Sequence, residues 1–197
     1  VFEFNETDLL NKNWRKTLES QVKKSDVIFH VGAISSTDAS DVNEVMFKNY
    51  EFSKILFDLA QQYGVKVIYS SSAAIYGNGD GIPKNLYAWS KKAAEDYGVV
   101  NNGLFVSLRY FNIFGLGESH KGKMASVAHQ ALSFKKRYSY VDDNDPRYPR
   151  PIYSLFPGSP KRDFVYIKDV ISANLAAITV PYGIYDVGTG ISRPFED

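Results

Sequence analysis

DVIFHVGA, residues 26–33, is the stretch of sequence that decides the fold. It is an apolar run set between the polar segments 23–25 (KKS) and 35–37 (SST). A short run that stays apolar without alternating is typical of a strand buried on both faces, as strands in parallel sheets are. Because parallel strands need a long crossover connection, we expect a helix to follow it.

The expected crossover helix covers residues 41–62, and Gly64 stands where helices commonly end. A second apolar run, 65–71 (VKVIYSS), follows at once and predicts the next strand. The side chains that we expect near one face of the helix are Val42, Val45, Met46, Asn49, Ser53, Leu56 and Ala60.

The same alternation continues to the end of the chain. Further helices are predicted at 86–99, 124–136 and 167–178, and further strands at 104–109 and 183–187. Strands alternating with helices of this length indicate an α/β fold, with a doubly wound parallel sheet and helices on both faces. Ligands of such sheets bind beyond the carboxyl ends of the strands, so functional residues should follow strands directly.

Composition excludes several classes of protein. The chain has 197 residues, 44% of them hydrophobic, and 23 basic side chains against 22 acidic ones leave a net charge of +1. No overall field therefore points to nucleic acid or an anionic membrane, and the apolar runs are too short to span a bilayer. There is no cysteine to support a disulfide-stabilised secreted fold. A cytoplasmic enzyme fits these properties.

Ser72, Tyr87 and Lys91 form the sharpest chemical pattern. Ser72 ends a predicted strand, and Tyr87 and Lys91 lie four positions apart, about one turn, on a predicted helix. A phenol is a poor base at neutral pH, but a nearby ammonium lowers its pKa toward the range of a general base. Ser72 could then donate a hydrogen bond to a substrate oxygen while Tyr87 exchanges the proton. A Y-x-x-x-K pair alone is often accidental, but a strand-terminal serine run before it favours catalysis.

A string of motifs extends this pattern over nearly the whole chain. In order they are HVGAISST (30–37), Asn49-Tyr50, YSSSAAIYG (69–77), PKNLYAWSK (83–91), RYFNIFG (109–115), RDFVYIKDV (162–170) and YDVGTG (185–190). Together they resemble the extended short-chain dehydrogenase/reductase superfamily of nucleotide-sugar epimerases and dehydratases. Two segments, 35–54 and ESHKGKMASVAHQ (118–130), resemble the ADP-L-glycero-D-manno-heptose 6-epimerases within it.

That resemblance implies an isomerase of lipopolysaccharide core biosynthesis. It would convert ADP-D-glycero-D-manno-heptose to the L-glycero form by transient oxidation at C6″ with bound NADP, NAD being the alternative. The resemblance implies that Tyr87 and Lys121 are the acid/base groups of the two faces. It also implies that Lys91 binds the cofactor and that Ser72 is the hydroxyl donor. A homo-oligomer is implied as well, with no nucleic-acid or membrane partner.

Further residues map by the same resemblance to ligand-lining positions. The cofactor positions are Gly32, Ala33, Ile34, Ser35, Asn49, Lys91 and Ile113. The substrate positions are Asn112, Lys123, Gln130, Phe156, Pro157, Gly158, Ser159 and Arg162. The Arg162 guanidinium suits a diphosphate, which it can contact with two parallel hydrogen bonds. Gln130 departs from the histidine usual in the heptose epimerases.

The domain organisation follows from the same comparison of motifs. We expect residues 1–137 to form a dinucleotide-binding domain that is incomplete at its N-terminus, and 138–162 to form a substrate-binding excursion or lid. Residues 163–190 should return to the Rossmann-like sheet, and 191–197 should start a truncated C-terminal part. About forty family residues, with the N-terminal βαβ part and its glycine-rich pyrophosphate turn, are expected before residue 1. The choice between NAD and NADP depends on that region.

Other functions remain open at this point. A 4-epimerase or 4,6-dehydratase acting on another nucleotide sugar would share the Ser–Tyr–Lys core, although Ala73-Ala74 replaces the acidic pair usual in dehydratases. A relative that binds nucleotide sugars without turnover is a further alternative. GESHKGKM (117–124) is close to a phosphate-binding P-loop, but Met124 replaces the Ser or Thr that holds Mg²⁺. No metal site is predicted, because His30 and His129 lack partners at ligand spacing and fit core or cleft positions better.

Overall fold

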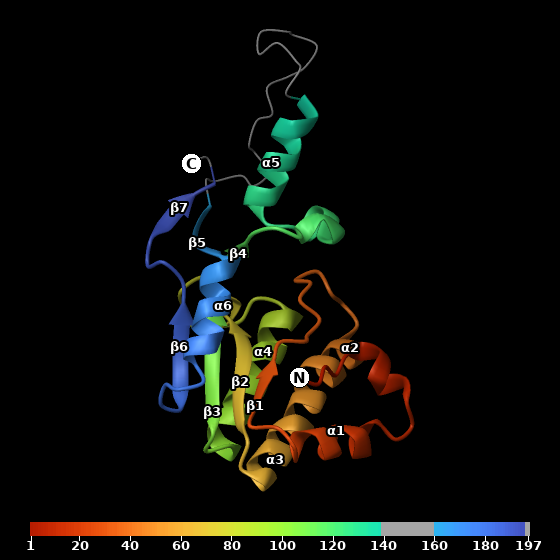
Figure 1. Ribbon diagram of the computed structural model, residues 1–197. Coiled ribbons are helices and arrows are strands. Elements are labelled where there is room, and N and C mark those ends of the chain that lie inside the picture. The colour runs from red at the N-terminus through yellow and green to blue at the C-terminus, as the bar shows by residue number, and fades with distance from the viewer. Residues whose placement is uncertain (139–159, 196–197) are drawn as a thin grey trace. The chain divides into compact units, whose positions relative to one another are not determined.

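The structure is a computed structural model and describes residues 1–138 and 160–195. The chain forms two compact units, which are described separately here (Figure 1). The first unit comprises Val1–Tyr110 and Ala173–Asp186, and the second comprises Phe111–Ser172 and Val187–Asp197. In the described part of the chain, no helix is both long enough and apolar enough to cross a membrane.

The first unit is built on a four-stranded sheet in the order β1-β2-β3-β6. Its strands are β1 (Val27–His30), β2 (Lys66–Ser72), β3 (Phe105–Tyr110) and β6 (Gly183–Val187). β1 pairs with β2 and β2 with β3, both in parallel. The predicted α/β fold with a parallel, Rossmann-like sheet is therefore confirmed.

One face of this sheet is covered by α1 (Trp14–Val22), α3 (Phe52–Tyr63) and α4 (Leu86–Asn101) (Figure 1). Phe57 and Tyr69 pack edge to face at 5.4 Å between ring centroids, a geometry that contributes about 1 kcal/mol beyond area burial. The buried cluster consists of Leu18, Val22, Leu56, Phe57, Ala60, Val65, Val67, Tyr69, Ala94 and Phe105.

The opposite face of the sheet carries the part of α6 (Ile167–Ala176) that belongs to the first unit. Lys66 Nζ donates to the carbonyl oxygens of Ile178 and Val180 at 2.8 Å. Further along β2, the Ser70 hydroxyl meets the Tyr110 hydroxyl at 3.1 Å, and Tyr110 donates to Asn174 Oδ1 at 3.0 Å. Since Lys66 and Ser70 alternate with the Val67 and Tyr69 of the core cluster, helices lie on both faces, as predicted.

β1 is shorter and more exposed than its sequence predicts. It ends at His30, whereas the apolar run continues to residue 33, and the Phe29 side chain is 40% exposed. The expectation of burial on both faces is wrong, because among the described strands β1 has β2 alone as a neighbour. An edge strand covered on one face keeps only part of its apolar surface from water.

The helix predicted at 41–62 is continuous but not uniform. It comprises α2 (Val42–Met46), a π-helical turn η2 (Phe47–Glu51) and α3. Val42, in the first turn of α2, is exposed, whereas the other members of the predicted face are buried or half-buried: Val45, Met46, Asn49, Ser53, Leu56 and Ala60. Gly64 ends the helix in the left-handed conformation, at φ 67° and ψ 31°, as the sequence predicts.

The N-terminal residues form elements that the sequence did not predict. The 3-10 turn η1 (Glu6–Leu10) starts with a capping box, in which Asn5 and Asp8 satisfy each other's backbone N–H groups. The helix α1 follows, and it packs on α3 through its buried Leu18 and Val22. Its low apolar content hid it, because two buried side chains make a weak periodic signal.

The second unit contains a three-stranded sheet in the order β4-β5-β7. β4 (Asn112–Phe114) pairs in parallel with β5 (Lys161–Tyr166), which pairs antiparallel with β7 (Ser192–Pro194). None of these strands was predicted, and Lys161 and Arg162 belong to β5 rather than to the excursion expected at 138–162. Residues 139–159 of that excursion lie outside the described residues.

Between β4 and β5 the second unit contains η4 (Glu118–Met124) and α5 (Val127–Tyr138), the latter close to the helix predicted at 124–136. The buried Asp163 of β5 accepts hydrogen bonds from the Thr189 and Gly190 backbone N–H groups at 2.9 and 2.7 Å. The unit begins at Phe111, earlier than the predicted boundary at 137. The binding roles given to the predicted domains stay predictions.

Candidate active site

Predicted site residues of the first unit gather at the carboxyl ends of β1 and β2. His30, the last residue of β1, is paired in register with Tyr69 of β2. The loop after His30 and the serine that ends β2 therefore leave the sheet at the same edge, where ligands of parallel sheets bind. α4 starts beside them, and Asn85 caps it by accepting from the Ala88 N–H at 2.8 Å.

Ser72 and Tyr87 are the first two members of the predicted triad. Ser72 caps the short turn η3 (Ala73–Tyr76), where its Oγ accepts from the Ala74 N–H at 3.1 Å and so keeps its own proton to donate. Burial raises the pKa of the Tyr87 phenol, and the neighbouring Ser72 hydroxyl lowers it in part. The sequence predicted a net lowering by the lysine ammonium, and this is wrong for the structure because burial dominates.

Lys91 is deeply buried for a lysine, with 3% of its surface exposed. Its Nζ lies over the Tyr69 ring, 4.4 Å from the centroid, and has no hydrogen-bond partner among the described residues. Burial lowers the pKa of Lys91 from 10.5 to about 7, against the raising effect of the Glu95 charge. An ammonium held in this way suits a ligand that brings its own acceptors, such as the hydroxyls of a cofactor ribose.

A buried charged network supports α4, and sequence reasoning missed it. Glu95 is fully buried, accepts from Ser107 Oγ at 2.6 Å and forms an ion pair with Arg109 at 2.6 Å. Arg109 donates in turn to the Tyr76 hydroxyl at 2.6 Å, and Tyr76 donates to Asp186 at 2.7 Å. Burial opposes ionisation of Glu95, but these donors hold its pKa below the usual value. The sequence signal was the spacing of Glu95, one turn after Lys91.

Asn49 joins the loop after β1 to α4. Its Oδ1 accepts from the Ile34 N–H at 2.7 Å, and its Nδ2 donates to the Ile34 carbonyl at 3.0 Å and to Ser90 Oγ at 2.9 Å. Ser90 donates to the Tyr87 carbonyl at 2.7 Å. Because Asn49 is 1% exposed, it supports this predicted cofactor loop from behind, whereas Gly32 and Ser35 of the loop are exposed.

His30 is a satisfied core histidine, as the sequence favoured. Its Nε2 lies 2.7 Å from Ser53 Oγ, which donates to the Asn49 carbonyl at 2.7 Å, so Nε2 carries the proton. Burial lowers the pKa of His30 to about 3, and the Lys91 charge adds to this effect. The described residues contain no group of three His, Cys, Asp or Glu side chains that could hold a metal ion.

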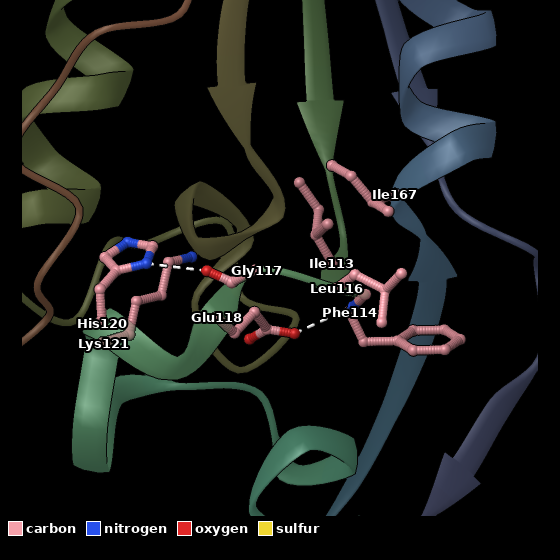
Figure 2. Close-up of a pocket in the computed structure, with 9 residues that line it drawn as sticks. Ile113, Phe114, Leu116, Gly117, Glu118, His120, Lys121 and Ile167 are labelled. Carbon is pink, nitrogen blue, oxygen red and sulfur yellow. Dashed lines mark hydrogen bonds between the residues drawn. The ribbon is translucent and has the colours of Figure 1, made fainter.

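The second unit brings Lys121 and Ile113 to one pocket (Figure 2). The pocket lies where β4 leads into η4, and the Lys121 side chain is exposed. His120 Nδ1 lies 2.8 Å from the Gly117 carbonyl oxygen, which fixes the ring next to Lys121. The lining residues are Ile113, Phe114, Gly115, Leu116, Gly117, Glu118, His120, Lys121 and Ile167.

The predicted substrate residues are distributed over the second unit. Asn112 is exposed on β4, and Arg162 is exposed on β5, where its guanidinium donates to the Lys161 carbonyl at 2.8 Å. Gln130 is half-buried on α5 and donates to the Ala125 carbonyl at 2.8 Å. Lys123 belongs to η4. The remaining predicted residues, Phe156, Pro157, Gly158 and Ser159, lie outside the described residues.

The chain is similar to known proteins in sequence and in fold. The model of the "NAD dependent epimerase/dehydratase family" matches residues 1–188. The chain is 34% identical over 193 residues to an ADP-L-glycero-D-manno-heptose-6-epimerase of Brachyspira hyodysenteriae, covering 87% of this chain and 56% of that protein. The chain therefore spans little more than half the length of this relative.

Two of the solved structures that are similar to the chain are epimerases by name. The ADP-L-glycero-D-manno-heptose-6-epimerase of Helicobacter pylori superposes with a TM-score of 0.78 at 31% identity, covering 94% of this chain and 59% of that one. A UDP-N-acetylglucosamine 4-epimerase from Methanobrevibacter ruminantium, solved with UDP-N-acetylmuramic acid, gives a TM-score of 0.77 at 27% identity. The match covers 96% of this chain and 62% of the archaeal one.

Proposed function

Because the chain belongs to the NAD dependent epimerase/dehydratase family, we propose that the full-length protein is an NAD(P)-dependent nucleotide-sugar epimerase. This membership confirms the superfamily predicted from the motifs. The proposed reaction converts ADP-D-glycero-D-manno-heptose to ADP-L-glycero-D-manno-heptose at C6″, and two similar proteins that carry this activity in their names support it. The observation that carries the proposal is a buried, unpartnered Lys91 ammonium one turn beyond Tyr87, at the sheet edge where Ser72 ends β2.

In this proposal Tyr87 and Ser72 act on one face of the sugar carbinol. Ser72 donates a hydrogen bond to the carbinol oxygen, and Tyr87 takes up or returns its proton. Lys91 holds the cofactor ribose through its ammonium group, which has no hydrogen-bond partner among the described residues. A bound nicotinamide supplies the acceptance and return of the hydride. The exposed part of the loop 32–35, braced by Asn49, lies along the cofactor.

Inversion needs a second proton donor, because the hydride returns to the opposite face of the planar ketone. We assign that role to Lys121, which lines its pocket together with Ile113 and is exposed to ligand. Arg162, exposed on β5, has the planar guanidinium that binds a diphosphate with paired hydrogen bonds. Asn112, Lys123 and Gln130 are the other described residues proposed to contact the substrate.

The proposed cofactor is NADP, with NAD as the alternative. Protein purified without added nucleotide and then denatured should release the bound dinucleotide, whose 2′-phosphate mass spectrometry detects. The predicted homo-oligomer and cytoplasmic location stay predictions.

The variants Tyr87→Phe and Lys121→Ala test the proposed function in the full-length protein. Removing either acid/base group should lower epimerisation by about 10²- to 10⁴-fold, the usual contribution of general acid–base catalysis. Bound dinucleotide should stay near the wild-type amount, because neither side chain is the proposed ribose contact. If either variant interconverts the two epimers at the wild-type rate, its assigned role is wrong.

A 4-epimerase is the second candidate function. The similarity to the archaeal UDP-N-acetylglucosamine 4-epimerase favours it. A dehydratase is less favoured, because Ala73 and Ala74 open η3 where an acidic pair would be needed. Assays of the wild-type protein with ADP-heptoses and with UDP-hexoses decide between the two epimerases. If the protein binds these sugars but none of them reduces the bound cofactor, the result favours a non-catalytic relative.

A further inference from the structure

The segment from Gly115 to Ser126, called the Lys121 segment below, is closed by one carboxylate. Glu118 lies inside the segment and is 8% exposed. Its Oε1 accepts from the Gly115 N–H at 2.9 Å and from Ser126 Oγ at 2.8 Å, and its Oε2 accepts from the Ser126 N–H at 2.6 Å. Glu118 thereby bonds the first residue of the segment to the last.

Both ends of the Lys121 segment are fixed to regular structure. At Gly115 a Cβ atom would lie 2.4 Å from Cγ2 of Ile167, so the backbone here passes directly against the start of α6. At the other end Ser126 Oγ accepts from the His129 N–H at 3.2 Å and so caps the first turn of α5. The Glu118 carboxylate therefore links the end of β4 to the beginning of α5.

Lys121 lies between these two ends and borders the same pocket as Glu118 (Figure 2). Figure 2 shows the His120 and Lys121 side chains rising from the helical turn, and Glu118 bonded back toward the end of β4. Burial opposes ionisation of Glu118, but the hydrogen bonds from Ser126 and Gly115, with the Lys121 charge, hold its pKa below the usual value. Glu118 is therefore a carboxylate at neutral pH.

These contacts favour one conformation of the segment, because hydrogen bonds to a charged acceptor are stronger than those to a neutral one. Between its two ends the segment contains η4, which is interrupted by a kink at Gly122 (φ 54°, ψ −122°). Without the carboxylate, the position of Lys121 has no comparable support.

We propose that Glu118 is a positioning residue for Lys121: by closing the segment at both ends, its carboxylate fixes where the lysine amine is presented to the sugar. This inference rests on the proposed function, in which Lys121 serves the face that Tyr87 does not. Glu118 acts mainly through the backbone of the segment, and its charge also interacts with that of Lys121. Its loss therefore impairs the Lys121 half of the reaction and leaves the Tyr87 half intact.

Glu118→Gln tests this in the full-length protein. The amide keeps the shape of the side chain, but it loses the charge and turns an NH₂ group toward the N–H donors. We expect epimerisation to fall about 10²-fold, the loss expected of a catalytic group misplaced by about an ångström. Reduction of the bound nicotinamide by each epimer in turn is followed by rapid mixing at its absorbance band. One epimer should reduce it at the wild-type rate and the other far more slowly.

Asp169→Asn is the matched control, because it removes one exposed carboxylate from α6 and should leave both rates unchanged. Equal losses for both epimers in Glu118→Gln, or no loss for either, overturn the inference. Lys121→Ala and Tyr87→Phe distinguish a failure of the proposed function from a failure of this inference. If these variants still epimerise normally, the proposed function fails. If they are inactive while Glu118→Gln is normal, this inference alone fails.

Ser126→Ala and Ser126→Thr keep the inference testable if Glu118→Gln does not fold. Alanine removes the hydroxyl that donates to Glu118 but keeps the Ser126 N–H bond, whereas threonine keeps both. We expect the same one-sided loss for alanine, about 10-fold since one of the contacts remains, and near wild-type rates for threonine. A loss that is equal for both epimers in Ser126→Ala, or one that threonine does not rescue, contradicts the proposal.

Discussion

The two lysines with proposed roles, Lys91 in the first unit and Lys121 in the second, are held in opposite ways. Lys91 stands on a helix of 16 residues, lies over the Tyr69 ring and is almost fully buried. Lys121 is exposed on a 3-10 turn that Glu118 closes. The difference teaches that burial in the protein interior determines the pKa of Lys91, whereas a few polar contacts determine the position of Lys121.

The carboxylates beside the two lysines show the same contrast. Glu95 is paired with the Arg109 guanidinium and with Ser107, on β3. Glu118 instead accepts from backbone N–H groups and from one serine of its own segment. These contacts of Glu95 come from side chains of another element, β3, so a substitution next to Glu95 on α4 does not remove them. The Glu118 contacts are local, so we expect that part of the site to be easier to disable.

Lys91→Met should have the largest effect on turnover and a small or favourable one on stability. The ammonium that holds the cofactor is lost, and we expect activity to fall about 10³-fold, within the range for positioned catalytic groups. The free energy of unfolding at pH 7 should stay equal or increase, because an apolar side chain replaces a desolvated amine. Assays of turnover and urea unfolding measure the two quantities on the same protein.

Lys92→Met is the control for that substitution. Lys92 is the next residue on α4 and forms a partly exposed ion pair with Asp96 at 2.8 Å. Such pairs contribute about 0–1 kcal/mol, so both activity and stability should change little. If Lys91→Met keeps its activity, Lys91 does not hold the cofactor. If its free energy of unfolding is several kcal/mol below that of wild type, the buried amine does not cost stability.

The pH dependence of stability should show the cost of burying Lys91. Its pKa is about 7 in the folded protein and 10.5 for the unperturbed group, so between these values the unfolded chain binds the extra proton. Stability should therefore rise with pH across this window, by up to about 1.4 kcal/mol per pH unit, whereas below the window the destabilising contribution of Lys91 should be constant. Urea unfolding of wild type and Lys91→Met between pH 7.5 and 9.5, about the middle of the window, measures the difference.

The charged and titratable groups that face Lys91 act outside this window. Burial lowers the pKa of His30 to about 3, so its contribution is lost as the pH falls below 6.5. Burial raises the pKa of Tyr69 well above 10.0, so the stability that it contributes is lost only in strong alkali. Glu95 has a lowered pKa and stays ionised. Parallel stability curves for wild type and Lys91→Met would show that Lys91 is solvated like an ordinary lysine.

Asn49→Ala should weaken the loop of the first unit and its connection to α4. It leaves the Ile34 N–H and Ser90 Oγ without their partner, and a lost buried hydrogen bond of this kind costs about 1–3 kcal/mol. Cofactor affinity should fall by roughly 10-fold, the equivalent of about 1.4 kcal/mol. Calorimetric titration with the dinucleotide checks the affinity, and Asn43→Ala on the exposed face of α2 is the control. Lower stability with unchanged affinity would restrict Asn49 to a purely structural role.

Sequence alone was sufficient for the fold class and for the places of Ser72, Tyr87 and Lys91 on their strand and helix. The apolar runs of β2 and β3 and the helical spacing of α4 are local patterns, and the chain realises them nearly as predicted. Ser72, Tyr87 and Lys91 were found because a strand end and one helical turn fix their relative positions. Their roles in catalysis stay predictions.

What the sequence did not reveal depends on partners distant in the chain. In the sequence, Glu95 and Arg109 cannot be told from ordinary surface charges. They are 14 positions apart in the chain, and the fold brings them into contact. The effect of burial on Tyr87 was missed for the same reason, since desolvation depends on what packs over the phenol. Glu118 looked like one charge of a polar loop. Spacing along a chain shows which side chains share an element but not which distant donor or acceptor completes them.

Gly122→Ala tests the weaker side of the comparison with the smallest change. Gly122 follows Lys121 directly and adopts φ 54° and ψ −122°, a conformation that residues with a Cβ atom rarely take. The strain costs about 1–3 kcal/mol, which the exposed turn relieves by shifting rather than by unfolding. We therefore expect an activity loss of about 10-fold, an affinity for the dinucleotide near that of wild type and a nearly unchanged unfolding midpoint.

Gly103→Ala is the control for adding a methyl group, because a Cβ there meets nothing within 4 Å and the residue has no left-handed φ. It should leave turnover, cofactor affinity and unfolding midpoint unchanged. If Gly122→Ala lowers the unfolding midpoint as strongly as a core substitution does, the Lys121 segment is part of the cooperative fold. In that case both lysines depend on the packed structure. The contrast between Lys91, held by the protein interior, and Lys121, held by the local contacts of Glu118, then fails.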